Sequence, residues 1–309
     1  MPKFLIIKPS SLGDIIHGLQ VADSLKDQLP GVEITWVVSK PFLALVEACD
    51  AVDRCLVFDR KGGISAFFRL IRDIRKEHYD VVIDMQGLAR SGLMTLASRA
   101  TLKLGRSDAR EGARFAYKLR APLPGAGEGS HAVEILSAFL LVIGLSAVPS
   151  RHLTFSKKTP WQAPWGDQKA LILFPNSRRP EKEWPYFAKL VDRLIEANFP
   201  GPIAWAGQDP LPVSDSWPED RFFNLMGKTS LAELPDAIAS ARLVVSNDSG
   251  PMHLAAAQGV PVLALFGPTP PERYGPYPLN APDHHVLRAP AGDLSQLSVD
   301  TVYEAINQL

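Results

Sequence analysis

Short runs of apolar residues alternate along the chain with longer segments in which apolar residues recur every three or four positions. Runs such as Phe4-Leu5-Ile6-Ile7 are apolar at every position, which is typical of strands buried on both faces of a parallel sheet. Strands are predicted at residues 4–8, 33–38, 54–58, 81–84, 170–174, 202–205, 243–246 and 262–266. Helices are predicted at residues 15–28, 64–78, 90–100, 131–143, 185–198, 231–241 and 251–258. This alternation predicts an α/β protein whose parallel strands are joined by crossover helices.

The length of the chain favours two domains. Its 309 residues exceed the size at which a single hydrophobic core usually stops growing, about 250–300 residues. Residues 149–167 are rich in proline and lack periodicity, so they are predicted to form a linker. We therefore expect two doubly wound, Rossmann-like domains, residues 1–155 and 156–309, facing each other across a cleft between the carboxyl ends of two sheets. The sequence leaves open whether the C-terminal helix packs back on the first domain.

Charge is distributed unevenly although the formal net charge is zero. Residues 60–120 contain 14 Lys and Arg against 6 Asp and Glu, a net charge of +8. This concentration favours a polyanionic partner, and solvated helix faces explain it equally well. Nucleic acid is disfavoured, because the sequence pI is about 7.1 and no basic motif is interleaved with aromatic residues.

Neither the cysteines nor the apolar segments indicate an exported or membrane-spanning chain. The two cysteines, Cys49 and Cys55, cannot form a disulfide framework, and no Cys/His cluster has the spacing of a zinc site. No segment approaches the roughly 18 to 20 apolar residues of a spanning helix. We expect a cytoplasmic protein that acts without a metal or other cofactor, and peripheral contact with the inner face of the inner membrane stays open.

The first candidate site segment follows the first predicted strand and reads Lys8-Pro9-Ser10-Ser11-Leu12-Gly13-Asp14. An aspartate held there by a tight turn can accept a proton from a hydroxyl nucleophile, which typically contributes about 10²- to 10⁴-fold in rate. The alternative is that Asp14 only caps the helix that follows.

The second segment leaves the first strand of the second half. It places Ser177, Arg178, Arg179 and Lys182 in one loop before a helix. Such a loop can bind a diphosphate, each charge-assisted hydrogen bond contributing about 1.5–3 kcal/mol. The alternative is a solvated basic loop that Trp184 anchors in the core.

The third segment runs from Val244 to Ala257 and contains Asn247-Asp248-Ser249-Gly250-Pro251-Met252-His253. A buried strand is predicted to end there, with Pro251 in the first turn of a helix, so free backbone N–H groups would meet phosphate or sugar oxygens. Asp248 could bind sugar hydroxyls, whereas His253 could equally be a core histidine. The fourth segment, residues 266–273, is a Gly/Pro-rich loop that could form a wall of the site or simply a turn.

Several enzyme classes are disfavoured because their motifs are absent from the sequence. There is no Walker loop, no Gly-x-Gly-x-x-Gly after a strand and no nucleophile elbow. A dinucleotide-dependent oxidoreductase would need that glycine fingerprint, whereas the first strand here is followed by Lys8 to Asp14. A catalytically idle module that binds a sugar nucleotide is harder to exclude, although Asp14 argues against it.

Taken in order, these segments resemble glycosyltransferase family 9, the bacterial heptosyltransferases of lipopolysaccharide core synthesis, whose architecture is two Rossmann-like domains of the GT-B type. The resemblance covers nearly the whole chain. Residues 10–14, 84–88 and 182–185, the 246–257 block and Gly267-Pro268-Thr269 carry it. Residues 109–111 and 131–134 resemble the members that add the first heptose to the inner Kdo sugar.

The resemblance implies inverting transfer of heptose from ADP-heptose to an anionic, lipid-linked saccharide. Asp14 would be the general base. The implied donor-binding residues are Asn176, Ser177, Lys182, Leu225, Met226, Asp248, Ser249, Gly250 and His253, with the backbone near Leu225 and Met226 facing adenine. The implied acceptor-binding residues are Ser11, Gly13, Arg60, Lys61, Arg90 and Arg110.

Three departures from the family pattern leave the sugar and the acceptor position open. Asn176-Ser177 stands where the members that add the first heptose have paired threonines, and Ile135 follows Glu134 in place of arginine. The residues after Asp248 are closer to the members that add the second heptose. A glycosyltransferase of the same fold with another nucleotide sugar or acceptor therefore remains the alternative.

Overall fold

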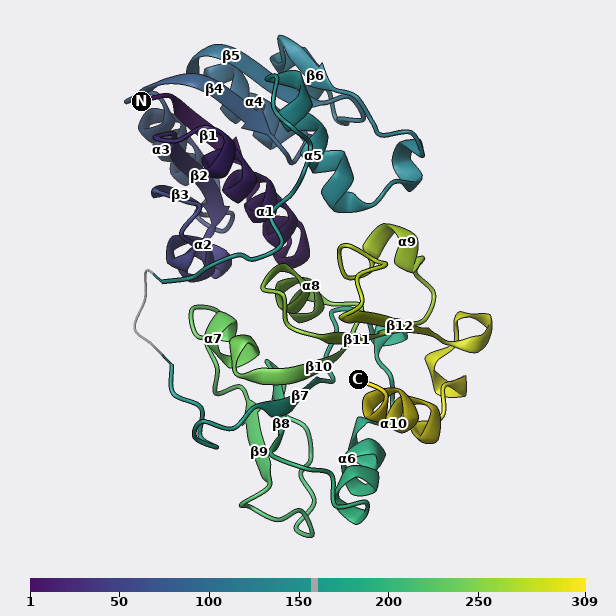
Figure 1. Ribbon diagram of the computed structural model, residues 1–309. Helices are drawn as coiled ribbons and strands as arrows, with labels where there is room; N and C mark the ends of the chain where they lie inside the picture. The colour runs from purple at the N-terminus through teal and green to yellow at the C-terminus, as the bar shows by residue number, and fades with distance from the viewer. Residues whose placement is uncertain (157–160) are drawn as a thin grey trace. The chain divides into compact units, whose positions relative to one another are not determined.

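The computed structural model describes residues 1–156 and 161–309 and divides the chain into two compact units, Met1–Lys158 and Thr159–Leu309 (Figure 1). Part of the predicted linker, residues 157–160, lies outside the described residues. The rest of that segment packs on the nearer unit. Leu153 and Phe155 are buried, and the Asp50 amide donates to the Thr154 carbonyl at 3.0 Å. Trp165 is buried in the second unit and meets Trp161 and Phe223 edge to face.

Within the described residues, the first unit is a six-stranded parallel sheet in the order β3-β2-β1-β4-β5-β6 with helices on both faces. Its strands are β1 (Lys3–Ile7), β2 (Glu33–Ser39), β3 (Arg54–Phe58), β4 (His78–Asp84), β5 (Arg99–Arg106) and β6 (Leu119–Ala121). Its α-helices are α1 (Leu12–Gln28), α2 (Leu43–Ala48), α3 (Gly63–Ile74), α4 (Ala89–Ala97) and α5 (Ala132–Val142). Short 3-10 turns are η1 (Lys40–Phe42), η2 (Ala113–Ala116) and η3 (Gly127–Gly129).

The described part of the second unit repeats this plan in the order β12-β11-β10-β7-β8-β9, again with parallel strands. Its strands are β7 (Ala170–Phe174), β8 (Ile203–Gly207), β9 (Phe222–Met226), β10 (Ala241–Asn247), β11 (Val262–Phe266) and β12 (His284–Arg288). Its α-helices are α6 (Phe187–Glu196), α7 (Leu234–Ala239), α8 (Gly250–Ala257), α9 (Pro271–Tyr274) and α10 (Val299–Asn307). The 3-10 turns are η4 (Pro180–Lys182), η5 (Pro290–Gly292) and η6 (Leu294–Gln296).

Apolar patterning explains why these elements form. Leu5, Ile6 and Ile7 of β1 are completely buried, as expected of a central parallel strand covered on both faces. In α6 the buried residues Phe187, Leu190, Val191 and Leu194 follow helical spacing and pack on the core of the second unit. The predicted fold class, two doubly wound α/β domains, is confirmed.

Several predicted helices were too long, because the strand that follows each of them was assigned to it. The helix predicted at residues 64–78 ends at Ile74, and His78 begins β4. The helix predicted at 90–100 ends at Ala97, and β5 begins at Arg99. The sequence reading also missed α2, α9 and the strands β5, β6, β9 and β12. The expected C-terminal helix is α10. Helix α10 packs through Val302 and Ile306 into the core of the second unit.

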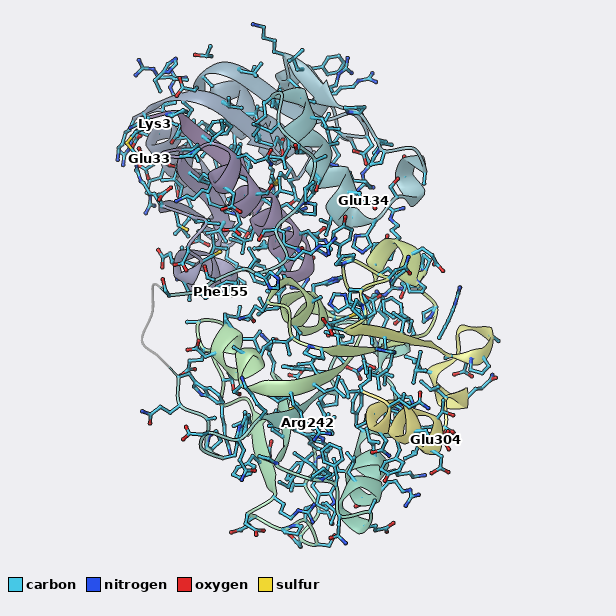
Figure 2. All side chains as sticks on the ribbon, viewed as in Figure 1. Lys3, Glu33, Glu134, Phe155, Arg242 and Glu304 are labelled. Atoms are coloured by element: carbon cyan, nitrogen blue, oxygen red, sulfur yellow. The ribbon has the colours of Figure 1, made fainter. Side chains whose placement is uncertain are left out.

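Ion pairs link the amino-terminal ends of strands in the first sheet, at the edge opposite the candidate site. Figure 2 shows Lys3 and Glu33 side by side at neighbouring strand starts, with Lys3 Nζ 3.7 Å from Glu33 Oε2 and 3.0 Å from Glu77 Oε2. Glu77 also pairs with Arg54. The candidate residues described next follow the opposite, carboxyl ends of the strands.

Candidate active site

The strand order of each sheet reverses direction at one point, and in such sheets ligands bind outside the carboxyl ends of the strands at that point. The reversal falls between β1 and β4 in the first unit and between β7 and β10 in the second. Three of the four predicted segments follow β1, β7 and β10, and the fourth follows β11 next to β10. Each unit therefore presents its candidate residues at the position that this topology favours.

Asp14 lies in the first turn of α1, and its carboxylate does cap that helix. Oδ2 accepts hydrogen bonds from the Ser11 hydroxyl at 2.7 Å and from the Ser11 amide at 3.1 Å. Oδ1 faces the Lys8 ammonium, with Nζ at 3.5 Å. The Asp14 side chain remains 45% exposed, so a solute can reach it. Helix capping and proton acceptance are thus compatible, because Ser11 fixes the carboxylate through one oxygen.

Lys8, the cation beside Asp14, is itself deeply buried. Its side chain is 3% exposed, and burial lowers the pKa of the ammonium while the charge of Asp14 opposes that shift. Arg106, at the end of β5, adds a repulsive positive charge and is held by two hydrogen bonds to Asp108 at 2.8 and 2.6 Å. The general-base candidate therefore lies in a local field of two fixed cations.

Asp84 is a second carboxylate at this edge and is completely buried at the end of β4. It accepts from the amides of Gln86 and Gly87, each at 2.9 Å, and from the Tyr117 hydroxyl at 2.7 Å. Burial raises the pKa of Asp84, and these donors oppose the shift. A side chain at Gly105 would overlap the Tyr117 ring, so glycine there permits the contact. This buried group fixes the loop before α4.

The predicted acceptor residues lie on four segments, which follow strands β1, β3, β4 and β5. Ser11 and Gly13 belong to the turn that holds Asp14. Arg60 and Lys61 are exposed in the turn after β3, which Asp59 orders by accepting the amides of Lys61 and Gly62 at 3.0 and 3.1 Å.

The segments that carry Arg90 and Arg110 are hydrogen-bonded to each other. The Arg110 amide donates to the Gly87 carbonyl at 2.9 Å, and the Ala89 amide donates to Glu111 Oε2 at 3.1 Å. Both arginine side chains are exposed. Two separate exposed cation pairs, Arg60 with Lys61 and Arg90 with Arg110, thus follow the carboxyl ends of the strands.

In the second unit, Asn247 ties the loop after β7 to the end of β10. Its side chain accepts from the Trp184 amide at 3.0 Å and donates to the Pro175 carbonyl at 2.8 Å. Trp184 is 2% exposed and anchors this loop in the core, as one reading of the sequence expected. The Ser177 amide donates to Glu183 Oε1 at 2.7 Å, so the loop is ordered at both ends.

The loop turns one of its cations inward. Lys182 Nζ lies 2.6 Å from Asp248 Oδ2, and the two side chains are 15% and 7% exposed. Asp248 Oδ2 also accepts from the Thr269 hydroxyl at 2.6 Å, and Lys182 lies over the Tyr274 ring at 5.9 Å. Arg178 and Arg179 are exposed instead, and Arg179 pairs with Glu181. Of the predicted basic residues in this loop, Lys182 is the one joined to the 246–257 block.

Helix α8 begins at Gly250, directly after this ion pair. Ser249 is its N-cap residue, and the Ser249 and Ser246 hydroxyls are 3.1 Å apart. Pro251 occupies the first turn, as the sequence predicted. His253 is 8% exposed, which agrees with its reading as a core histidine.

Asn176, Leu225 and Met226 converge around the end of β8. A Cβ at Gly207 would collide with Asn176 Oδ1 and would come within 2.9 Å of Met226 Cε, so both side chains use the space that glycine leaves. The Gly227 amide donates to the Gly207 carbonyl at 2.8 Å, which joins the two strand ends. Leu225 and Met226 are 8% and 4% exposed.

Two shallow grooves adjoin the loop after β11. One is lined by Gly267, Pro268, Arg288, Ala289, Ala291 and Gly292. The other is lined by Pro180, Glu181, Glu183, Pro185, Pro268, Gly292, Asp293, Leu294 and Ser295. Among the described residues, no group of three or more His, Cys, Asp or Glu side chains is placed to hold a metal ion. In the same part of the chain, no helix is long and apolar enough to cross a membrane.

Sequence reasoning did not assign roles to Lys8, Asp84, Tyr117, Asn247 or Thr269. Four of them lie in or beside segments that were singled out, so position after a strand was the available signal. Tyr117 gave no such signal, because it reaches Asp84 from 33 residues further along the chain.

Comparison with known proteins gives consistent matches over most of the chain. The family model described as glycosyltransferase family 9 (heptosyltransferase) matches residues 67–298. The lipopolysaccharide core heptosyltransferase OpsX of Haemophilus influenzae is 28% identical over 289 residues, which cover 89% of this chain and 82% of that protein. Lipopolysaccharide heptosyltransferase 1 of Escherichia coli K12 is 27% identical over 324 residues, which cover 99% of this chain and 100% of that protein.

Solved structures of a heptosyltransferase also match nearly the whole chain. The structure of E. coli heptosyltransferase WaaC with ADP superposes with a TM-score of 0.83 at 26% identity and covers 99% of both chains. The structure of the same protein with ADP-2-deoxy-2-fluoro heptose gives a TM-score of 0.80 at 25% identity, again over 99% of both chains.

Proposed function

The chain belongs to glycosyltransferase family 9 and is a glycosyltransferase, and from this premise we propose that it transfers heptose from ADP-heptose to the Kdo-containing inner core of lipopolysaccharide. The single observation that carries the donor assignment is the Lys182–Asp248–Thr269 cluster directly before α8. It provides a cation and a helix N-terminus, the two features that bind a diphosphate. The matched structures with ADP and with a fluorinated ADP-heptose support the choice of nucleotide.

The proposed reaction is a direct displacement at the anomeric carbon with inversion. Asp14 accepts the proton of the acceptor hydroxyl as its oxygen forms the new bond to carbon, and the bond from that carbon to the diphosphate breaks. Ser11 and Lys8 hold the Asp14 carboxylate in place. The negative charge that grows on departing ADP is offset by Lys182 and by the amides of the first turn of α8.

Lys182 must move a short distance to do this, because in this structure its ammonium contacts Asp248. We propose that the donor diphosphate attracts Lys182 and that Asp248, with Ser249, Gly250 and His253, then faces the sugar and phosphates. Asn176 and Ser177 would contact the diphosphate, and the chain around Leu225 and Met226 would face adenine. No metal is required in this scheme, because fixed cations neutralise the leaving group.

For the acceptor, we propose that the exposed cations Arg60, Lys61, Arg90 and Arg110 bind phosphates or carboxylates of a lipid-linked saccharide. Ser11 and Gly13 would contact the attacking sugar beside Asp14. Kdo is a carboxylated sugar, and arginine suits planar carboxylate recognition. The proposed place of action is the cytoplasm at the inner face of the inner membrane, where such an acceptor is accessible to a nucleotide-sugar donor.

Calorimetric titration of the purified chain with ADP-heptose, ADP-glucose, UDP-glucose, GDP-mannose and NAD tests the donor assignment. We expect ADP-heptose to bind most tightly and ADP alone to retain much of the affinity. Preference for a uridine or guanosine donor would leave the assignment as a glycosyltransferase intact but would contradict heptose as the transferred sugar. Binding of NAD alone would contradict the proposal.

A further inference from the structure

Helices α3 and α4 form one continuous outer layer on the first unit. Both cover the same side of the sheet, since Leu70 and Ile74 of α3 and Met94 of α4 share one core cluster with Leu5 and Ile7. Their C-terminal ends are joined by a hydrogen bond of 3.0 Å from the Arg75 guanidinium to the Ala97 carbonyl. The turn η2 continues this layer, because Gly92 of α4 lies so close to Ala113 that a Cβ there would be 2.9 Å from the Ala113 backbone.

The solvent side of this layer carries large apolar side chains, which we call the outer apolar patch. It consists of Ile64 and Phe68 on α3, Leu93 and Leu96 on α4, and Phe115 on η2. Their exposed fractions are 77%, 66%, 52%, 60% and 80%. Single exposed apolar residues are ordinary on soluble proteins, but a cluster on adjoining elements marks an interaction surface. Ile64 and Phe68 are four residues apart and therefore lie on one stripe of α3.

Basic side chains surround this patch, and most nearby acids are already engaged. Residues 60–120 hold 14 basic and 6 acidic residues. Of the acids, Asp84 is buried, Asp108 pairs with Arg106, and Asp73 pairs with Lys76. The exposed cations on the same elements include Arg69 and Arg72 on α3, Arg90 on α4, and Arg114, whose guanidinium lies 5.1 Å from the centre of the Phe115 ring.

We propose that this face docks on an anionic phospholipid bilayer. Exposed aromatic and aliphatic side chains among arginines are the combination that binds a membrane surface, because the apolar groups enter the interface while the cations meet lipid phosphates. A second copy of the chain fits poorly, since a symmetric contact would bring two strongly basic faces together. Because α3 and α4 start just after β3 and β4, the patch adjoins the strand ends where Asp14 lies. Docking would therefore bring that edge to a lipid-linked acceptor.

Co-sedimentation with vesicles tests the face directly. The unmodified chain is expected to bind vesicles that contain phosphatidylglycerol, to release them as salt rises, and to bind phosphatidylcholine vesicles much more weakly. Phe68→Glu with Leu96→Glu should weaken binding to the anionic vesicles at least tenfold, and Arg69→Glu with Arg72→Glu should do the same. All four positions are exposed, so folding should be kept.

Leu141→Glu provides the matched control. Leu141 is 57% exposed on α5, which packs against α1. Helix α1 covers the opposite side of the sheet, since its Gly18 contacts Trp36, whose side chain points away from that of Val37 in the α3 cluster. This variant should bind vesicles like the unmodified chain.

The outcomes separate this proposal from the proposed reaction, since vesicle binding needs neither donor nor acceptor. Patch variants should keep their transfer rate on a detergent-dispersed acceptor and lose at least fivefold on a vesicle-embedded one. The docking proposal is overturned if the unmodified chain ignores anionic vesicles, if patch and control variants bind equally, or if the patch variants instead dissociate a dimer.

Discussion

Replacing Lys182 by alanine removes the cation that we propose binds the donor diphosphate. A charge-assisted hydrogen bond to an anion is worth about 1.5–3 kcal/mol. Since about 1.4 kcal/mol corresponds to a tenfold change in affinity, Lys182→Ala should weaken ADP binding by roughly 10- to 150-fold. Adenosine lacks the diphosphate, so its affinity should stay within about twofold.

The same substitution also leaves Asp248 without its charged partner. The Asp248 side chain is 7% exposed and would keep the Thr269 hydroxyl as its donor from this cluster. An under-bonded buried carboxylate costs about 1–3 kcal/mol, so the variant should also unfold at lower urea concentration. This cost is measured separately from affinity, because it is present without ligand.

The diphosphate contact is tested by calorimetric titration of the unmodified chain and two variants with ADP and with adenosine. Lys189→Ala is the matched control, because Lys189 lies on α6 with its ammonium 5.1 Å from the centre of the Tyr186 ring, outside the cluster. It should leave both affinities unchanged. An unchanged ADP affinity in Lys182→Ala, or an equal loss for adenosine, would refute the diphosphate contact.

Three further predictions concern the first unit. Asp14→Ala should abolish transfer in a coupled ADP-release assay and leave donor affinity within a few-fold; wild-type turnover would remove the general-base assignment. Tyr117→Phe takes a donor from buried Asp84 and should destabilise the chain by about 1–3 kcal/mol in urea, whereas an unchanged midpoint would show that the bond is unimportant. Burial lowers the pKa of Lys8 below 10.5, so the unfolded chain binds more protons between the two values and stability rises with pH across that window. In Lys8→Met, the free energy of unfolding measured by urea titration should lack this rise with pH. A rise equal to that of the unmodified chain would contradict the assignment to Lys8.

The central strands were predictable because they are buried on both faces and read as uninterrupted apolar runs. The strands β5 and β12 were not, because neither is an uninterrupted apolar run. In β5, Arg and Lys interrupt the apolar residues, and in β12 only Val286 and Leu287 are apolar, between two histidines and Arg288. At the site, position after a strand pointed to Asp14, Lys182 and Asp248. The pairing of Lys182 with Asp248 could not be predicted, because it joins residues 66 positions apart through the fold.

The most direct test of the central claim is transfer itself. Purified chain is incubated with ADP-heptose and a lipid-linked acceptor that ends in Kdo, and the products are followed by mass spectrometry with the anomeric configuration determined by NMR. The account predicts one added heptose per acceptor, one ADP released per heptose, and an anomeric configuration opposite to that of the donor. Retention of configuration, or transfer from a different nucleotide sugar while ADP-heptose is left unused, would contradict it.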